Sequence, residues 1–158
     1  MTAHQAALEA LTRYFGYDSF RPGQQGIVEA LLAGRDVLGV MPTGAGKSVC
    51  YQIPAALSPG MTLVISPLIS LMRDQVDALN DLGLPAAFIN TTQTPDEQAM
   101  VFAQAAAGQI KLLYVAPERL ETGRFRDFAA RTPISLIAVD EAHCVSQSVS
   151  YTHLRAHE

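Results

Sequence analysis

Short apolar runs recur along this chain, and polar or small residues follow each of them. Val, Ile and Leu dominate the runs, a composition typical of strands that are buried on both faces. Because such strands need no alternation of polar and apolar positions, these continuous runs predict a parallel sheet. The predicted strands are residues 37–40, 61–65, 86–89, 112–115 and 134–139.

The segments between these runs carry apolar residues at every third or fourth position, which is the spacing of an amphipathic helix. Pro22 and Pro95 stand where a first helical turn accepts proline, and Gly34, Gly83 and Gly108 stand where helices end. Strands that alternate with helices predict an α/β fold, with a mainly parallel sheet covered on both faces. The predicted helices are residues 3–14, 22–33, 48–54, 68–82, 95–107 and 124–130.

Residues 36–48 (DVLGVMPTGAGKS) form the segment around which we expect the chemistry to be arranged. A buried strand, a Gly-rich turn and a helix N-terminus predict a phosphate-binding loop for a nucleoside triphosphate. Lys47 would reach the β- and γ-phosphates, and the Ser48 hydroxyl would hold Mg²⁺. The full Walker pattern requires Gly at the position of Met41, so an ordinary strand–turn–helix is the alternative. The cofactor-binding residues predicted in this loop are Thr43, Gly44, Ala45, Gly46, Lys47 and Ser48.

Two carboxylates, Asp140 and Glu141, follow the last predicted strand. In a phosphate-loop enzyme Asp140 would hold Mg²⁺ through its water shell, and Glu141 would polarise the attacking water. On its own, such a pair is more often the solvated start of a loop. Because the carboxyl ends of parallel strands meet at one edge of a sheet, we expect the pair to lie near Lys47.

The 158-residue length fits one domain with a sizeable core, and a formal net charge of −4 argues against a protein that coats nucleic acid through global positive charge. No run approaches the length of a membrane span, and no secretory signal is evident, so we expect a cytoplasmic protein without membrane contact. Cys50 and Cys144 stand apart, which favours two buried thiols over a disulfide framework or zinc site.

Four ordered motifs together resemble the first motor domain of RecQ-family DNA helicases: residues 41–48 (MPTGAGKS), 66–72 (SPLISLM), 114–120 (YVAPERL) and 140–144 (DEAHC). The resemblance implies a three-layer RecA-like P-loop domain with a mainly parallel sheet. It also implies ATP and Mg²⁺ as cofactors, single-stranded and duplex DNA as partners, and a nucleoid-associated 3′–5′ helicase of recombination and repair. Lys47, Asp140 and Glu141 would be its catalytic residues, and the Met41 departure is expected in such motors.

Two other functions stay open from the residues. One is an RNA helicase of the related DEAH type, against which stand Cys144 and residues 20–24 (FRPGQ). The other is a nucleotide-binding module without catalysis.

The block at residues 17–24 (YDSFRPGQ) is similar to the adenine-reading element of RecQ helicases. The resemblance implies that Tyr17 stacks on the base and that Arg21 lies beside it. Gln24 would bind the adenine edge, because an amide donates and accepts at once. Core packing is the alternative for Tyr17, and it is the interpretation we favour for Phe20.

Small polar residues and one arginine follow the other predicted strands, and the resemblance assigns them to contacts with the phosphates of a DNA strand. The alternative is that Ser66 and Thr91 cap helices and that Glu118 and Arg119 form a local ion pair. His143 has no partner at metal-ligand spacing, so we expect it to link the nucleotide site to the DNA. The predicted DNA-binding residues are Ser66, Pro67, Asn90, Thr91, Glu118 and Arg119.

Residues 148–158 (SVSYTHLRAHE) contain no tryptophan, whereas RecQ proteins continue with a Trp-containing, aromatic-rich loop. The stretch resembles translated sequencing-adapter residue, so we expect a helicase ATP-binding domain over residues 1–147 that is C-terminally truncated, followed by a non-native, disordered tail. A divergent surface tail is the alternative. In this fold a strand after Glu141 normally pairs beside residues 37–40, whose apolar edge its loss would expose. We expect the 158-residue chain to bind ATP–Mg²⁺ weakly and to unwind no DNA.

Overall fold

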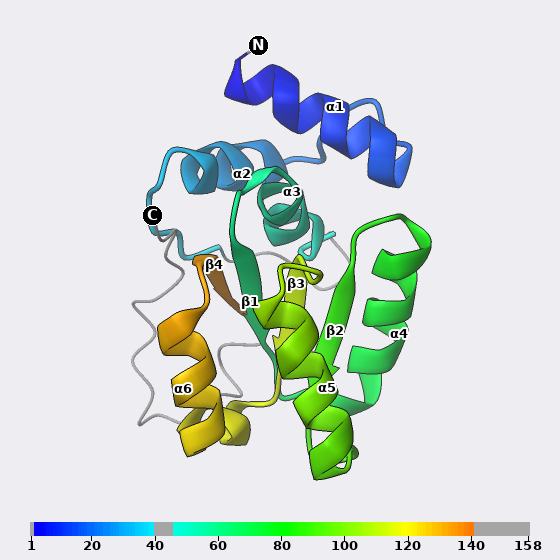
Figure 1. Cartoon of the computed structure of the whole chain (residues 1–158). Helices are drawn as coiled ribbons and strands as arrows, with labels where there is room; N and C mark the ends of the chain where they lie inside the picture. The colour runs from blue at the N-terminus through cyan, green and yellow to red at the C-terminus, as the bar shows by residue number, and fades with distance from the viewer. Residues whose placement is uncertain (1, 40–45, 141–158) are drawn as a thin grey trace.

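The computed structural model describes residues 2–39 and 46–140. Its centre is a sheet of parallel strands in the order β2-β3-β1-β4 (Figure 1). The four strands are β1 (Met61–Ile65), β2 (Ala86–Ile89), β3 (Leu112–Val115) and β4 (Ile134–Val139). They coincide with four of the five runs predicted from the sequence.

Helices make every crossover between consecutive strands of this sheet, as a parallel arrangement requires. Helix α4 (Ile69–Asp81) joins β1 to β2, and α5 (Pro95–Ala106) joins β2 to β3. The 3₁₀ helix η1 (Pro117–Glu121) and α6 (Gly123–Arg131) join β3 to β4. The sequence analysis predicted α4, α5 and α6 but not η1, whose five residues are too few to establish a helical period.

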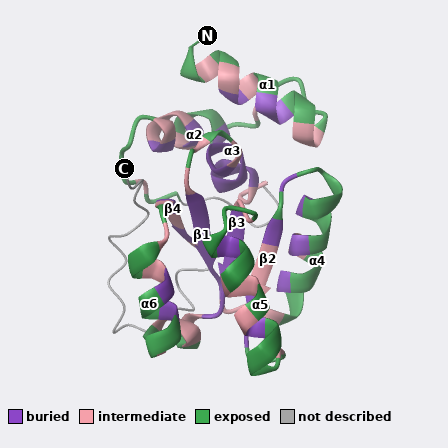
Figure 2. Ribbon diagram, in the orientation of Figure 1, coloured by how far each residue is buried: buried purple, intermediate pink, exposed green. Residues whose placement is uncertain are grey.

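Alternate residues of the strands point to opposite faces of the sheet, and each face has its own core (Figure 2). One face packs against α4, α2 (Gln24–Leu32) and α3 (Val49–Leu57). The other face packs against α5 and α6, where the rings of Phe102, Phe125 and Phe128 contact one another. These are the three layers and the α/β fold class that the sequence predicted.

Helix α1 (Ala3–Phe15) lies outside these layers and packs on α2 and α3. Thr2 and Gln5 form a capping box at its start, and Gly16 ends it with φ 75°. Phe20 packs against the same cluster of apolar side chains, which confirms the core role favoured for it.

The strand predicted over residues 37–40 is wrong for the part that the structure describes, because residues 36–39 lie outside every strand. Leu38 is 77% exposed and Val37 is half-buried, so the segment is not the buried strand that its apolar composition suggested. Apolar composition gives a segment the propensity for a strand, but a strand also needs a neighbour for its backbone hydrogen bonds. No strand among the described residues pairs with this segment.

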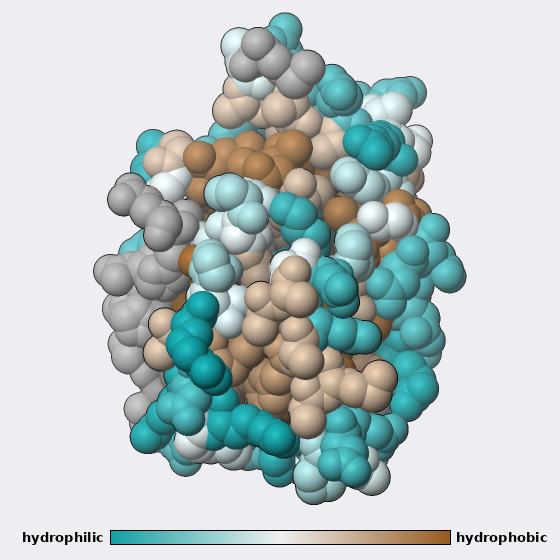
Figure 3. Space-filling model, in the orientation of Figure 1, coloured by the Kyte–Doolittle hydropathy of each residue, from teal (hydrophilic) through white to brown (hydrophobic). Residues whose placement is uncertain are grey.

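The surface in Figure 3 is hydrophilic along α4, and a weakly apolar area covers the Ala-rich helix α5. Helix α3 continues through Pro54 to Leu57, farther than the predicted helix. It buries Cys50, as expected of that thiol, and Cys144 lies outside the described residues. In the part of the chain that the structure describes, no helix is both long and apolar enough to cross a membrane.

Candidate nucleotide-binding site

The carboxyl ends of the strands are level with one another along one edge of the sheet. Ile65 of β1 pairs with Val115 of β3 and with Val139 of β4, and Val115 also pairs with Ile89 of β2. The residues that follow continue this row, since Asp140 donates its backbone N–H to the Ile65 carbonyl oxygen at 2.9 Å. The register therefore places the predicted DNA-contact segments and Asp140 at one edge.

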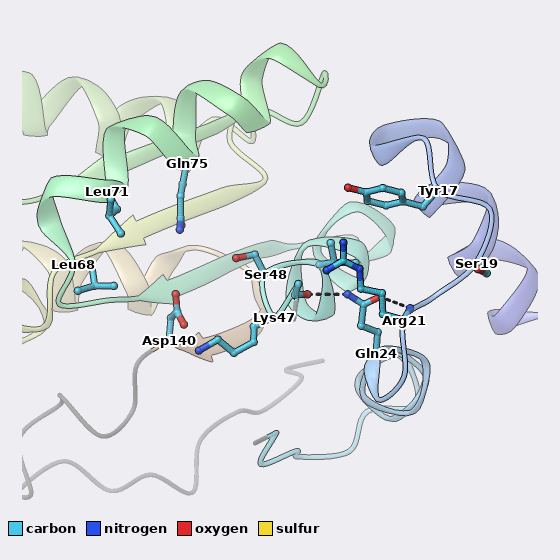
Figure 4. Close-up of a pocket in the computed structure, with 12 residues that line it drawn as sticks. Tyr17, Ser19, Arg21, Gln24, Lys47, Ser48, Leu68, Leu71, Gln75 and Asp140 are labelled. Atoms are coloured by element: carbon cyan, nitrogen blue, oxygen red, sulfur yellow. Dashed lines mark hydrogen bonds between the residues drawn. The ribbon is translucent and has the colours of Figure 1, made fainter. Parts of the chain in front are cut away.

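A pocket of about 560 Å³ opens at this edge (Figure 4). Its walls come from three parts of the chain: the 17–24 block, the start of α3, and the strand ends that include Asp140 and the beginning of α4. Lys47, Ser48 and Asp140 all line it, and Figure 4 shows the Lys47 side chain extending toward the Asp140 carboxylate. The predicted convergence of the lysine with the carboxyl end of the last strand is thus present in the structure.

The positive end of α3 also faces this pocket. The helix begins at Val49, and the side chain of Ser48 before it makes no capping hydrogen bond. The dipole of a helix gives its N-terminus a partial positive charge that attracts anions, and Lys47 adds a full positive charge beside it. Gly46 immediately precedes these residues with φ 75°, a conformation that glycine adopts without strain.

The 17–24 block forms the far side of the pocket. Tyr17 is 51% exposed, and Figure 4 shows its ring on the same side of the pocket as the Arg21 guanidinium. This exposure does not fit core packing, the alternative considered for Tyr17, and leaves its ring accessible to a planar ligand. Ser19 also lines the pocket and was not among the predicted site residues.

Gln24 lines the pocket although it is only 4% exposed, and its amide joins two loops. Its Oε1 accepts a hydrogen bond from the backbone N–H of Arg21 at 2.8 Å, and its Nε2 donates to the Gly46 carbonyl oxygen at 2.9 Å. Both ends of the amide that we expected to read adenine therefore hold protein backbone.

Helix α4 contributes two pocket residues, Leu71 and Gln75, that were not among the predicted site residues. Met72, Val76 and Leu79 are buried against the sheet, whereas Leu71 is 45% exposed and lines the pocket with Gln75. The helical period alone did not separate the buried residues of α4 from those that line the pocket, because Leu71 and Met72 are both apolar. The signal available was Gln75, a polar residue four positions after Leu71 and therefore on the same side of the helix.

The residues predicted to contact DNA differ in accessibility. Ser66 is buried, and its Oγ accepts a hydrogen bond from the Leu68 N–H at 3.2 Å. Asn90 is only 2% exposed, and its Oδ1 accepts hydrogen bonds from the N–H and hydroxyl of Thr92. Both side chains are therefore occupied in shaping turns, and Pro67 is half-buried beside them.

Thr91 and Glu118, by contrast, are exposed, and Arg119 is half-buried. The Nε of Arg119 is buried and finds no hydrogen-bond partner within the described segments, where no salt bridge joins it to Glu118. A local ion pair, the alternative interpretation, is thus not formed, and an acceptor is lacking for this N–H.

Five of the predicted site residues lie outside the part of the chain that the structure describes. They are Thr43, Gly44, Ala45, Glu141 and His143.

The residues at the pocket fit a nucleotide-bound Mg²⁺ better than a metal held by protein alone. No group of three or more His, Cys, Asp or Glu side chains able to hold a metal occurs among residues 2–39 and 46–140. Ser48 and Asp140 supply a hydroxyl and a carboxylate at one pocket, and Mg²⁺ binds one or two such groups together with phosphates and water. The donor set therefore suits the expected cofactor pair of ATP and Mg²⁺.

Comparison with known proteins agrees with this geometry. The profile of the DEAD/DEAH box helicase family matches residues 21–157. The chain belongs to the DEAD/DEAH box helicase family. This family match includes residues 148–157, which we expected to be foreign, and the domain boundary at residue 147 stays a prediction.

Within the DEAD/DEAH box helicases, curated relatives of the chain are RecQ proteins. The ATP-dependent DNA helicase RecQ of Haemophilus influenzae is 52% identical over 89% of this chain and 23% of its own length. The RecQ helicase of Bacillus subtilis is 47% identical over 89% of this chain and 24% of its own length. The resemblance to RecQ helicases is confirmed, and the chain spans about a quarter of the length of these relatives.

Solved helicase structures share the fold. The DUF1998 helicase MrfA, bound to DNA and AMPPNP, matches 90% of this chain and 22% of its own with a TM-score of 0.72 at 20% identity. A hypothetical ATP-dependent RNA helicase from Sulfolobus tokodaii matches 88% of this chain and 41% of its own with a TM-score of 0.66 at 22% identity. At these identities the likeness shows the RecA-like fold alone.

Proposed function

We propose that this chain carries the ATP-binding site of a RecQ-type, ATP-dependent 3′–5′ DNA helicase. The observation that supports the proposal most strongly is the meeting of Lys47, Ser48 and Asp140 at one pocket, with Tyr17 and Arg21 across from them. One side carries positive charge, a helix N-terminus and magnesium-type ligands, and the other carries an exposed aromatic ring. This is the division that a triphosphate attached to a planar base requires.

On the phosphate side, Lys47 binds the β- and γ-phosphates and the backbone of residues 43–46 cradles them. Ser48 and Asp140 hold Mg²⁺, which when bound neutralises charge on the phosphates. Glu141 orients the attacking water and accepts its proton. Lys47 and Asp140 lie beside each other on this side of the pocket, so the triphosphate and its metal ion would sit between the strand end and the helix start.

On the base side, Tyr17 stacks on adenine and Arg21 lies beside it. The contribution of Gln24 is more limited than a free amide would allow, since Arg21 and Gly46 already occupy its Oε1 and one Nε2 proton. Gln24 lines the pocket, and its contribution to adenine binding is to hold the base-side loop and the phosphate-side loop together.

DNA binds along the row of strand ends, through backbone phosphates. The exposed Thr91 and the Arg119 guanidinium make direct contacts, and Pro67 and Glu118 lie along the same track. Ser66 and Asn90 act from beneath by fixing the two turns. His143 couples this track to the nucleotide site. Because the chain has a formal net charge of −4, its whole surface does not attract DNA, and the DNA contact is confined to this track.

The relatives named DNA helicases favour a DNA substrate over an RNA substrate, so the DEAH-type RNA helicase is the weaker alternative. The proposed setting is the nucleoid in the cytoplasm, and the proposed process is recombination and repair. The catalytic cycle belongs to the longer protein, since the chain spans about a quarter of its relatives.

Nucleotide binding is testable on the 158-residue chain with a fluorescent ATP analogue and Mg²⁺. Lys47→Ala should weaken binding at least about tenfold, because the main phosphate charge is lost. Arg126→Ala is a matched control, since it removes a cation from the exposed side of α6 on the opposite face of the sheet. If the unmodified chain, Lys47→Ala and Arg126→Ala bound the ATP analogue equally well, the proposed site would be contradicted.

Helicase activity is testable on the longer parent protein. Lys47→Ala and Glu141→Gln should each abolish ATP hydrolysis that single-stranded DNA stimulates, and unwinding should proceed only from 3′-tailed duplexes. If DNA did not change the rate of ATP hydrolysis, the result would instead favour the alternative of a nucleotide-binding module.

A further inference from the structure

The turn that joins β2 to α5 is held from its inner side by three amide side chains. The Gln93 Oε1 accepts from the Asn90 N–H at 3.1 Å, and the Gln93 Nε2 donates to the Phe88 carbonyl oxygen at 2.9 Å. Gln98 of α5 donates from its Nε2 to the Asn90 carbonyl oxygen at 3.0 Å. Asn90 itself accepts from the Thr92 N–H at 2.9 Å. Neither glutamine was among the predicted site residues.

Gln98 lies on the first turn of α5 and is only 9% exposed. Burying an amide costs free energy unless it is hydrogen-bonded, and an apolar side chain of similar size would fill the same space without that cost. The partners of this amide are the carbonyl oxygens of Asn90 and, at 3.5 Å, of Gln93. Packing alone therefore does not account for a glutamine at this position, whereas fixing the turn does.

The helix that carries Gln98 starts at a fixed point. Thr94 and Glu97 form a capping box, in which the Thr94 N–H donates to the Glu97 carboxylate at 2.8 Å and the Glu97 N–H donates to the Thr94 hydroxyl at 3.2 Å. The hydrogen bond from the Thr94 N–H, followed by that with the Thr94 side chain, lowers the pKa of the Glu97 carboxyl, so the carboxylate keeps this contact at neutral pH. The turn is thus fixed by β2 at one end and by a capped helix at the other.

Thr91 is the residue that this turn presents to solvent. It follows directly on the row of strand ends, where Ile89 of β2 pairs with Val115 of β3. Thr91 is exposed, and in the part of the chain that the structure describes its N–H and hydroxyl make no hydrogen bond. A backbone N–H and a hydroxyl are groups that commonly donate to the phosphate oxygens of nucleic acid.

We propose that Gln93 and Gln98 are positioning residues that hold the turn in the conformation in which Thr91 binds a phosphate of a DNA strand. The inference rests on the DNA contact proposed for Thr91. A turn that is ordered before binding loses less conformational entropy on binding than a loose loop does. The two glutamines therefore raise DNA affinity without touching DNA, and they do so only through the turn.

The test measures binding of a labelled single strand of DNA to the longer parent protein by fluorescence anisotropy. Gln98→Met removes the amide and keeps a side chain of similar length, and it should weaken DNA binding about fivefold. Gln93→Met should act in the same direction. Gln104→Met is the matched control, because Gln104 is an exposed glutamine on the same helix, and it should leave DNA affinity unchanged.

A double-mutant cycle and nucleotide titration separate positioning from a general loss of structure. In a Thr91→Ala background the turn has lost the side chain that it presents, so Gln98→Met should weaken DNA binding by less than about twofold more. Nucleotide affinity should not change, because α5 and α3 pack on opposite faces of the sheet. Unchanged DNA affinity in both glutamine variants, an undiminished loss in the Thr91→Ala background, or an equal loss of nucleotide affinity would each overturn the inference.

Thr91→Ala alone distinguishes this failure from failure of the proposed DNA contact. If Thr91→Ala weakens DNA binding and neither glutamine variant does, only the positioning role is wrong. If Thr91→Ala leaves DNA affinity intact, the DNA contact at Thr91 is wrong, and the inference is wrong with it. Urea unfolding shows which variants fold, and Gln93→Met carries the same test should Gln98→Met not fold.

Discussion

The side-chain amide of Gln24 donates a hydrogen bond to the backbone carbonyl oxygen of Gly46 at 2.9 Å, across 22 positions of the sequence. The same amide accepts a hydrogen bond from the Arg21 N–H at 2.8 Å. The loop that faces the base and the loop that faces the phosphates are thus held together by one buried side chain. A change at Gln24 should therefore be felt on both sides of the pocket.

Gln24→Glu tests this link with almost no change of shape. The carboxylate can still accept from Arg21, but it cannot donate to Gly46 and places a negative charge against a carbonyl oxygen. We expect the free energy of unfolding to fall by about 1–3 kcal/mol and ATP affinity to fall with it. Urea denaturation and nucleotide titration measure the two effects. Gln25→Glu, at the exposed neighbouring position, should leave both within error.

Gly46→Ala should disturb the same contact from the other side. An added Cβ would lie 2.6 Å from the Gln24 Nε2, and the backbone φ of 75° is strained for alanine. We expect a loss of about 1–3 kcal/mol in stability, together with weaker nucleotide binding. Gly26→Ala is the control, because its Cβ would meet nothing within 4 Å inside α2 and should stabilise the chain by about 0.5–1 kcal/mol. Similar outcomes for the two glycines would show that Gly46 has no special constraint.

Asn90 and Thr91 are adjacent in the sequence but should respond differently to removal of their polar groups. Asn90→Ala removes the buried acceptor that holds Thr92 in the turn and should lower the free energy of unfolding by about 1–3 kcal/mol. Thr91→Ala changes an exposed side chain and should alter stability by less than about 0.5 kcal/mol.

DNA binding by the longer parent protein completes this comparison, with fluorescence anisotropy of a labelled single strand as the measurement. Thr91→Ala should weaken DNA binding without loss of stability. If Asn90→Ala weakened DNA binding and Thr91→Ala did not, Thr91 would not be a DNA contact. The effect of Asn90→Ala would then be explained by the loss of the turn that Asn90 holds.

The sequence was a good guide wherever local pattern and packing agree. The four strands of the sheet match their predicted runs residue for residue, because the runs lie between two layers of helices that cover the two faces of the sheet. The sequence misled at residues 37–39, where composition favours a strand but pairing decides whether one forms. Strand pairing depends on whether an adjacent strand is present, and the residues of the segment itself do not show this.

The site was predictable to the extent that it depends on strand register. Asp140 reaches the pocket because it continues the row of parallel strand ends, which the order of motifs already implied, whereas Lys47 and Ser48 reach it from the start of α3, which packs on this sheet. The roles of Gln24 and Asn90 were not predictable in this way. The residue type does not show whether an amide side chain is buried or exposed. Only the fold shows that the amides of Gln24 and Asn90 make hydrogen bonds to backbone atoms.

Leu71 and Met72 are consecutive apolar residues of α4, and the structure assigns them to different surfaces. Met72 is 1% exposed in the core beneath the helix, so Met72→Ala should lower the free energy of unfolding by about 2–4 kcal/mol. Leu71 is 45% exposed at the pocket, so Leu71→Ala should cost less than about 1 kcal/mol.

Ligand binding should reverse this ranking. Because Leu71 lines the pocket, Leu71→Ala should change nucleotide affinity measured at a temperature where both variants are folded, whereas Met72→Ala should not. Urea denaturation followed by nucleotide titration of the same two proteins provides both readouts. If Met72→Ala lowered nucleotide affinity and Leu71→Ala did not, α4 would affect binding through its packing on the sheet. The side chains of α4 that face the ligand would then not be responsible.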